Sequence, residues 1–345
     1  MKRIGIATLV LCAFLCFAWG QTAGSGKIIR FNVPGAQGTV GQSIATDGSV
    51  AGAYTDSNGV LHGFLRSVAG KYTKFDPPDS VGTYTSAVNS KLAVTGSYKD
   101  TNGAFHGFVR SPKGKITPFD APGAGKGNYQ GTLAYAINSE GEVVGYYTGA
   151  SQEYHAFFRT AGGKVTGFEA PGAGKGSTQG TIAVAVNDGG AISGNYVDSN
   201  NSYHGFVRAA NGTFTSFEVP QSSETYVSSI NAKGTVAGTY DGSTGTDGFL
   251  RLADGKMTLF GPATGGVYVG TINDAGAVVG SVVDNNNYSE HGYVRSPGGK
   301  ITYFNVPGAG NALGQGTYAY ANNASGQITG AYVDSNGVGH GFVRQ

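Results

Sequence analysis

Residues 131–172 of the chain read GTLAYAINSEGEVVGYYTGASQEYHAFFRTAGGKVTGFEAPG. This stretch holds four short segments rich in Val, Ile, Tyr, Phe and Thr, and turn residues separate them. In the first turn, Asn138 can hydrogen-bond its own backbone, and Gly141 stands where the chain needs a positive φ. Segments of this composition between such turns are typical of β-strands joined by hairpins. The stretch therefore predicts one four-stranded antiparallel unit.

The same pattern occurs seven times along the chain. The Phe of its last segment returns every 43 to 49 residues, at Phe31, Phe75, Phe119, Phe168, Phe217, Phe260 and Phe304. A third-segment phrase, His-Gly-Phe-Val-Arg or a variant, ends in Arg66, Arg110, Arg159, Arg208, Arg251, Arg295 and Arg344. Phe108 and Val109 point to opposite faces of their segment and are both apolar, so the sheet is expected to be buried on both sides. The pattern predicts an all-β, seven-bladed β-propeller with four antiparallel strands per blade; an open β-solenoid is the alternative.

The two ends of the repeated region complement each other. Residues 27–33 form a last-segment phrase with no unit before it, and the chain ends at Gln345, after a third segment that has no fourth. We expect strand 27–33 to join the final blade beside the strand that ends at Arg344, because this closes the ring without an exposed edge. A linear solenoid gives no reason for this match.

The first twenty residues have the pattern of a secretory signal peptide. Lys2 and Arg3 precede an apolar run that ends at Trp19, and small residues flank a cleavage point after Gly20. We expect a secreted, extracellular or periplasmic protein; a retained membrane anchor is the alternative. The remaining residues, 21–345, are expected to form a single domain with blades at about 38–78, 82–122, 131–171, 180–220, 224–262, 266–307 and 316–345, the last completed by 27–34.

Composition narrows the range of partners. The chain has 60 Gly without a three-residue period, which excludes a collagen triple helix. Its formal net charge is +2 and no Lys/Arg block is present, which argues against a nucleic-acid binder. Both Cys lie within the expected signal peptide, and no later apolar run is long enough to span a membrane. No segment has apolar residues at a sustained helical period, so no helix is expected after the signal peptide.

Several motifs that suggest chemistry are better explained by the repeat. All six His occupy one repeat position, so they are spread around the ring and are expected to be hydrogen-bonded structural residues, with no metal site and no cofactor. The segment 123–127 resembles a phosphate loop but lacks the Ser/Thr and the helix that should follow. The turn at 56–59 lacks the acidic residue that would complete a calcium site. The seven strand-ending Arg are expected to form a solvated rim.

The third repeat resembles a known family. His155-Ala-Phe-Phe-Arg159, together with Ile137-Asn-Ser-Glu-Gly-Glu-Val-Val-Gly145, is similar to the extracellular repeat family named for its His-Ala-Phe core. The resemblance covers the chain after the signal peptide, although most copies here read His-Gly-Phe and the family's usual Trp is absent. It implies secretion and a propeller-like repeat, and no particular chemistry.

The loops that join one repeat to the next vary most, and variable loops on a rigid scaffold often carry binding. We expect them at the mouth of the central channel, where amide side chains can hydrogen-bond a neutral polar ligand. The candidate ligand-binding residues are four amides, one stacking ring and two cations: Gln37, Gln130, Gln179, Gln315, Tyr129, Lys126 and Lys175. A solvated rim explains these loops equally well.

The sequence therefore favours a secreted, non-enzymatic binding or scaffold propeller that engages a polysaccharide or a cell-surface protein. The alternative is an extracellular lyase or hydrolase acting on glycans or cyclic peptides at the same mouth. A structural surface protein without a small ligand is the third possibility.

Overall fold

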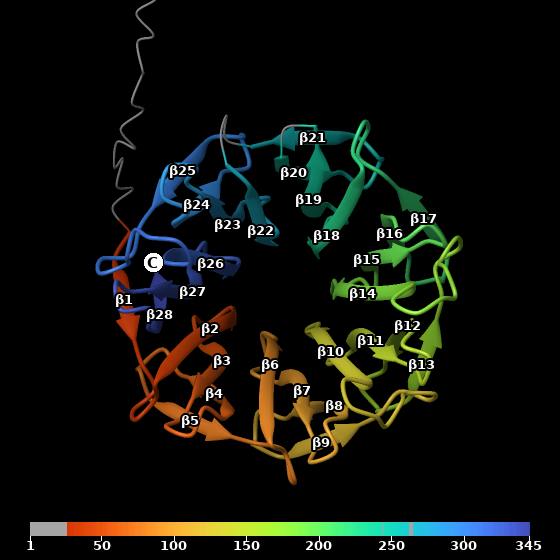
Figure 1. The fold of residues 1–345 in the computed structure, drawn as a ribbon, viewed down its shortest axis with the longest axis horizontal. Coiled ribbons are helices and arrows are strands. Elements are labelled where there is room, and N and C mark those ends of the chain that lie inside the picture. Colours follow the sequence, from red (N-terminus) through yellow and green to blue (C-terminus); the bar gives the residue numbers. More distant parts are fainter. Residues whose placement is uncertain (1–25, 244, 262–264) are drawn as a thin grey trace, which may run out of the picture.

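The computed structural model describes residues 26–243, 245–261 and 265–345, and within these ranges the chain is all-β, with 28 strands and no helix. The signal peptide expected over residues 1–20 lies outside the described residues. Figure 1 shows the strands grouped into small sheets that stand in a ring around a common axis. Among the described residues, no helix is long and apolar enough to cross a membrane. The arrangement is that of a β-propeller, as the sequence predicts.

The strands form four-stranded antiparallel units, each made of strands that follow one another in the chain, with one exception. Single parallel residue pairs, such as Glu290 with Gly316, join some neighbouring units into larger sheets. From the innermost strand outward, the units are β2 (Gly38–Ile44), β3 (Val50–Thr55), β4 (Leu61–Arg66) and β5 (Tyr72–Phe75); β6 (Gly82–Val88), β7 (Val94–Lys99), β8 (Phe105–Arg110) and β9 (Ile116–Phe119); β10 (Gly131–Ile137), β11 (Val143–Thr148), β12 (Tyr154–Arg159) and β13 (Val165–Phe168); β14 (Gly180–Val186), β15 (Ile192–Val197), β16 (Tyr203–Arg208) and β17 (Phe214–Phe217); β18 (Glu224–Ile230), β19 (Val236–Gly242), β20 (Gly245–Arg251) and β21 (Met257–Phe260); β22 (Val267–Ile272), β23 (Val278–Val283), β24 (Glu290–Arg295) and β25 (Ile301–Phe304); and β26 (Gly316–Asn322), β27 (Ile328–Val333), β28 (Gly339–Arg344) and β1 (Ile28–Phe31).

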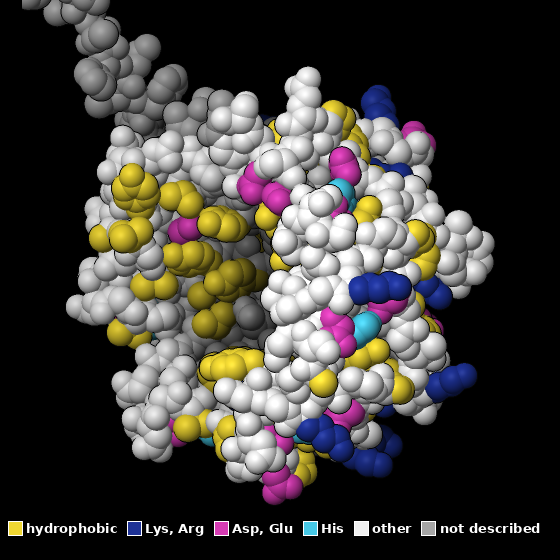
Figure 2. Space-filling model, turned by 45° about the vertical axis from the view of Figure 1, so that its right-hand side comes forward, with side chains coloured by type: hydrophobic (Ala, Val, Ile, Leu, Met, Phe, Trp, Pro, Cys, Tyr) yellow, Lys and Arg dark blue, Asp and Glu magenta, His cyan; other side chains and the backbone are white. Residues whose placement is uncertain are grey.

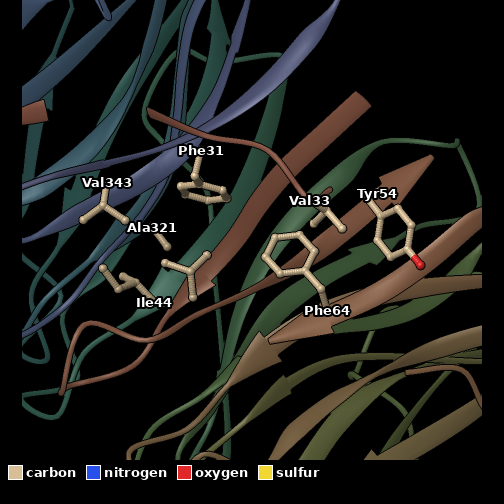
Figure 3. Close-up of a cluster of buried hydrophobic side chains, with 8 residues drawn as sticks. Phe31, Val33, Ile44, Tyr54, Phe64, Ala321 and Val343 are labelled. Atoms are coloured by element: carbon tan, nitrogen blue, oxygen red, sulfur yellow. The ribbon is translucent and has the colours of Figure 1, made fainter. Parts of the chain in front are cut away.

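The exception is the unit that joins the two ends of the chain. Strand β1 pairs antiparallel with β28, with Ile28 opposite Arg344 and Phe31 opposite Gly341. This is the pairing predicted for residues 27–33. Figure 3 shows the buried cluster beside it, in which Phe31 and Val343 lie with side chains of the next unit, including Phe64. The first strand therefore supplies both hydrogen bonds and apolar packing to the last sheet.

Neighbouring sheets are joined by a repeated aromatic contact. The ring of Phe75, from an outermost strand, meets the buried ring of Phe108 in the next unit edge to face, with centroids 6.0 Å apart. In the same way Phe119 meets Phe157, and its ring lies so close over Gly107 that a Cβ there would collide with it. The repeated Gly of the third-segment phrase therefore makes room for the ring. The other pairs are Phe31–Phe64, Phe168–Phe206, Phe217–Phe249, Phe260–Tyr293 and Phe304–Phe342.

The strand-ending arginines belong to this contact, so the expectation of a solvated rim was wrong. The Arg110 guanidinium carbon lies 5.2 Å from the centre of the Phe75 ring, and the side chain is 7% exposed. Burial lowers the pKa of Arg110 from its ordinary value. A guanidinium over an aromatic face is attracted by the negative charge of that face. The arginine side chain thus covers the aromatic pair on its outer side.

A second set of contacts runs around the axis, at the turns that follow the innermost strands. The side-chain amide of Asn89 donates to the backbone carbonyl of Asn138, at 2.8 Å, in the next unit. Asn323 donates to the carbonyl of Ala45, at 2.9 Å, and so links the last unit to the first. The remaining links are Asn138 to Asn187, Asn187 to Asn231, Asn231 to Asn273 and Asn273 to Asn323.

Replacing Phe31 by Ala should lower the free energy of unfolding by about 3–5 kcal/mol, because the ring is buried at the junction of the first and last units. Denaturant unfolding followed by circular dichroism measures this. Lys27→Ala, an exposed position next to the same strand, is the control and should stay within about 0.5 kcal/mol of wild type. Equal stability of the two variants would show that the junction contributes nothing.

Replacing Asn323 by Ala should cost about 1–3 kcal/mol, because the buried Ala45 carbonyl loses its side-chain donor. The same unfolding measurement applies. Ser325→Ala is the matched control, since its hydroxyl bonds only within its own turn. A loss no larger than that of the control would contradict the role given to this link.

Candidate ligand-binding site

The innermost strands leave aromatic side chains on the wall of the central channel. The ring of Tyr268, on β22, is 59% exposed, although it lies inside the ring of sheets. Tyr320, on β26, is the extra residue of a β-bulge between Ala319 and Ala321. Bulges re-aim side chains beside functional sites. Figure 2 looks into the central hollow and shows hydrophobic side chains covering much of its wall.

A cavity of about 420 Å³ opens between β22 and β26. The rings of Tyr318 and Tyr320 are stacked along one side, with centroids 6.5 Å apart and planes at 27°. The wall is formed by Tyr268, Val269, Gly270, Ser281, Glu290, Tyr318, Ala319 and Tyr320. Glu290 carries the one carboxyl group among the otherwise apolar or hydroxyl-bearing side chains of this wall.

Glu290 is held firmly at the first position of β24. Its backbone N–H donates to the carbonyl of Gln315 at 2.8 Å, and the residue is 8% exposed. Burial raises the pKa of its carboxyl, while a hydrogen bond from Ser281 and the charge of His291 oppose this rise. Within the described part of the chain, its Oε2 has no hydrogen-bond partner.

Glu290 also breaks the repeat. The position before the histidine carries an uncharged residue in the other units: Leu61, Phe105, Tyr154, Tyr203, Thr246 and Gly339. A side chain that departs from a repeated structural position has no structural role that the other copies require. The buried carboxyl therefore points to a role specific to this sector of the ring.

More tyrosines lie in contact with one another in other units of the ring, on or beside the innermost strands β10 and β18. The ring of Tyr146 makes edge-to-face contacts with Tyr135 and Tyr154, at 5.5 and 5.3 Å between centroids. The ring centroids of Tyr203 and Tyr226 lie 5.1 Å apart. Burial raises the pKa of the Tyr146 hydroxyl, so it remains neutral at physiological pH. Of these residues, Tyr135 and Tyr226 lie on innermost strands, so tyrosines occur on this layer in more than one unit.

Three of the glutamines predicted to bind ligand have their amides engaged within the protein. The Oε1 of Gln130 accepts from the backbone of Gly127 at 2.9 Å, and its Nε2 donates to the carbonyl of Ala150 at 3.2 Å. Gln179 and Gln315 make the equivalent pair of bonds. These amides tie the loop between two units to a neighbouring hairpin.

The other four predicted residues lie at the surface of loops between units, Gln37 in the loop between β1 and β2. Gln37, Lys126 and Lys175 are exposed. Tyr129 is 65% exposed, and the Lys99 ammonium lies 3.9 Å from the centre of its ring. None of the seven predicted residues lines the cavity beside Glu290. The structure therefore separates the predicted loop site from the tyrosine-lined cavity.

The histidines are hydrogen-bonded side chains, as expected from their repeated position. The Nδ1 of His62 lies 2.8 Å from Asp76, its Nε2 lies 3.5 Å from Asp56, and its ring stacks on Tyr54. Asp56 also accepts two backbone N–H bonds in its turn, and the bond from Val60 makes the largest contribution to lowering its pKa. The Nδ1 partners of the others are Asp120, Glu169, Glu218, Asn305 and Asn32. In the described ranges, no group of three or more His, Cys, Asp or Glu could hold a metal ion.

No protein family matches the chain, and no curated protein sequence matches it. Solved β-propellers do match its fold. Virginiamycin B lyase from Staphylococcus aureus is 15% identical, with 93% of this chain and 99% of that one covered and a TM-score of 0.62. The propeller domain of the Trilobed protease from Pyrococcus furiosus is 7% identical (90% and 94% covered, TM-score 0.57). The BP39L lectin from Burkholderia pseudomallei is 10% identical (88% and 98% covered, TM-score 0.52). The class of the protein is therefore a β-propeller, a fold shared here by enzymes and lectins.

Replacing Glu290 by Gln should stabilise the fold at neutral pH and have little effect near about pH 4. When unfolded, the carboxyl has a pKa of about 4.3; burial raises that value in the folded chain. At low pH both states hold the proton; as the pH rises above the unfolded pKa, the unfolded chain releases the proton first, so stability falls until the pH passes the folded pKa and then levels off. An amide escapes this cost. Thermal melts at a series of pH values should show a gap in Tm that widens with pH.

Glu140→Gln serves as the control for this series. The Glu140 carboxyl is exposed and lies 3.6 Å from the exposed Lys91 ammonium, a contact that contributes little in water. Its effect on Tm should be small at every pH. A gap for Glu290→Gln that is constant or narrows with rising pH would contradict the assigned shift.

Proposed function

We propose that this protein is a secreted, non-enzymatic seven-bladed propeller that binds a glycan in its tyrosine-lined channel. The observation that carries the proposal is the cavity of about 420 Å³, in which exposed tyrosine rings surround a single carboxyl group. Flat apolar rings offer stacking surfaces for the C–H faces of sugars, and a few placed polar groups then fix orientation. The BP39L lectin shows that a propeller of similar fold can be a lectin.

The count of seven blades rests on the seven sequence repeats and on the 28 strands, which divide into units of four. Secretion rests on the signal-peptide pattern of residues 1–20 and on the resemblance to the His-Ala-Phe repeat family. A secreted propeller meets extracellular polysaccharides and cell-surface proteins. The small, concave and aromatic site favours a sugar over a protein surface, because protein interfaces are large and comparatively flat.

An enzyme is the second candidate, and Glu290 is the observation that favours it. Burial raises the pKa of its carboxyl, and a raised pKa is typical of carboxyl groups that act as general acids. Glycoside hydrolysis normally requires two carboxyl groups, and the wall of this cavity contributes one. The geometry therefore supports binding better than hydrolysis.

A glycan array tests the proposal with the wild-type protein and two variants. Tyr268→Ala should weaken binding about 10-fold, because it removes an exposed ring from the cavity wall at a cost of about 1.4 kcal/mol. Gln130→Ala should bind as the wild type does, because the Gln130 amide hydrogen-bonds to the backbone of Gly127 and Ala150 and does not line the cavity. Loss of binding by Gln130→Ala alone would place the site at the loops, and shortening of any bound polysaccharide would establish the enzyme instead.

A further inference from the structure

The cavity between β22 and β26 has the composition of a cage for an organic cation. Three tyrosine rings, Tyr268, Tyr318 and Tyr320, line it together with Glu290. The face of an aromatic ring carries partial negative charge and attracts a cation held against it, most strongly where water is excluded. No lysine or arginine side chain is part of this wall. Every group that lines the cavity is thus neutral, negative or attractive to positive charge.

The burial and hydrogen bonding of Glu290 indicate the charge of the ligand that would fit the cavity. The side chain is more than nine-tenths buried, and its Oε2 has no hydrogen-bond partner among the described residues. Ionising a buried carboxyl is costly, and a ligand that brings a positive charge and N–H donors lowers that cost. A neutral hydroxyl or acetamide group could donate a hydrogen bond, but it would bring no positive charge to the carboxyl.

A metal ion fits the cavity poorly. Calcium and magnesium require about six oxygen ligands, whereas this wall offers one carboxyl among rings and small side chains. An ammonium group needs fewer directed contacts, because it is held by ring faces together with one carboxylate. The wall therefore favours an ammonium group over a metal ion.

From this geometry we infer that the bound glycan carries a free amino group, and that its ammonium enters the cavity against Glu290 and the three tyrosine rings. The saccharide part of this inference rests on the proposed function; the cage for the cation stands on the cavity alone. The ligand class is an amino sugar whose nitrogen is not acetylated.

Isothermal titration with three probes tests the inference: a glucosamine trimer, an N-acetylglucosamine trimer and tetramethylammonium. The glucosamine trimer should bind at least about 10-fold more tightly than the acetylated trimer, and tetramethylammonium should compete with it. Glu290→Gln should remove that preference. Glu140→Gln removes the same charge at an exposed site and should keep it.

The pH dependence of tetramethylammonium binding provides a further check, because this probe is charged at every pH. Its affinity should rise as Glu290 loses its proton. The groups that face Glu290 are Tyr268 on β22, His291 on β24, and Tyr318 and Tyr320 on β26. Burial raises the tyrosine pKa values, that of Tyr320 to about 12, so these two rings on β26 stay neutral. The rise should disappear in Glu290→Gln; its persistence in that variant would contradict the role given to Glu290.

The outcomes separate this inference from the function on which it rests. Equal binding of both trimers, with no binding of tetramethylammonium, would overturn the amino-sugar inference and leave the glycan-binding function intact. Binding of tetramethylammonium without either trimer would support the cation cage and overturn the glycan. Failure of all three probes would overturn the inference, and the glycan array then decides the function separately. Circular dichroism of each variant confirms that it is folded.

Discussion

The edge-to-face contact between a phenylalanine of one sheet and the third strand of the next is the interaction on which the rest of the structure depends. Phe75 against Phe108 is one copy, and Arg110 covers it from outside. The contact requires a phenylalanine, a glycine that makes room and an arginine, and these are the residues that recur along the sequence. At the junction of the two chain ends, Phe31 takes the same place although it comes from the first strand. The joint between sheets is thus made in the same way where the ring closes.

The innermost strands also pack into the core, as Ala134 and Ile137 of β10 do, but the side chains that they turn toward the axis take no part in this aromatic contact. Their side chains toward the axis can vary without loss of the fold. Tyr135 and Tyr320 occupy bulges in these strands, where the hydrogen-bond ladder is interrupted and the side chain is re-aimed. The exposed tyrosines of the channel follow from this freedom. The innermost strands therefore contribute to the core with one face and leave the side chains on the axis free for recognition.

Glu290 shows how one sector acquires chemistry that the others lack. Its backbone occupies the same place as that of Phe105 or Tyr154, each of which donates its N–H to the carbonyl of the glutamine that ends the loop leading to the next unit. The scaffold is thus unchanged while the side chain is replaced by an acid. A carboxyl placed there meets tyrosines from two neighbouring sheets, and its burial raises its pKa. A repeat protein can in this way acquire a site in one unit without changing the packing contacts between its sheets.

The sequence by itself determined the all-β fold, the four-stranded unit and the pairing of the first strand with the last, because turn residues and strand composition act locally and recur. It also identified the histidines as structural. Only the tertiary structure showed that Arg110 is buried, that Gln130 is a loop clamp, and that Tyr268, Tyr318 and Glu290 share one cavity. Tyr268 and Tyr318 lie one repeat apart, and their meeting depends on how adjacent sheets are rotated and packed. The local sequence pattern predicts which residues form a strand. A site on the axis combines residues from different strands, and the curvature of the ring decides which of them meet.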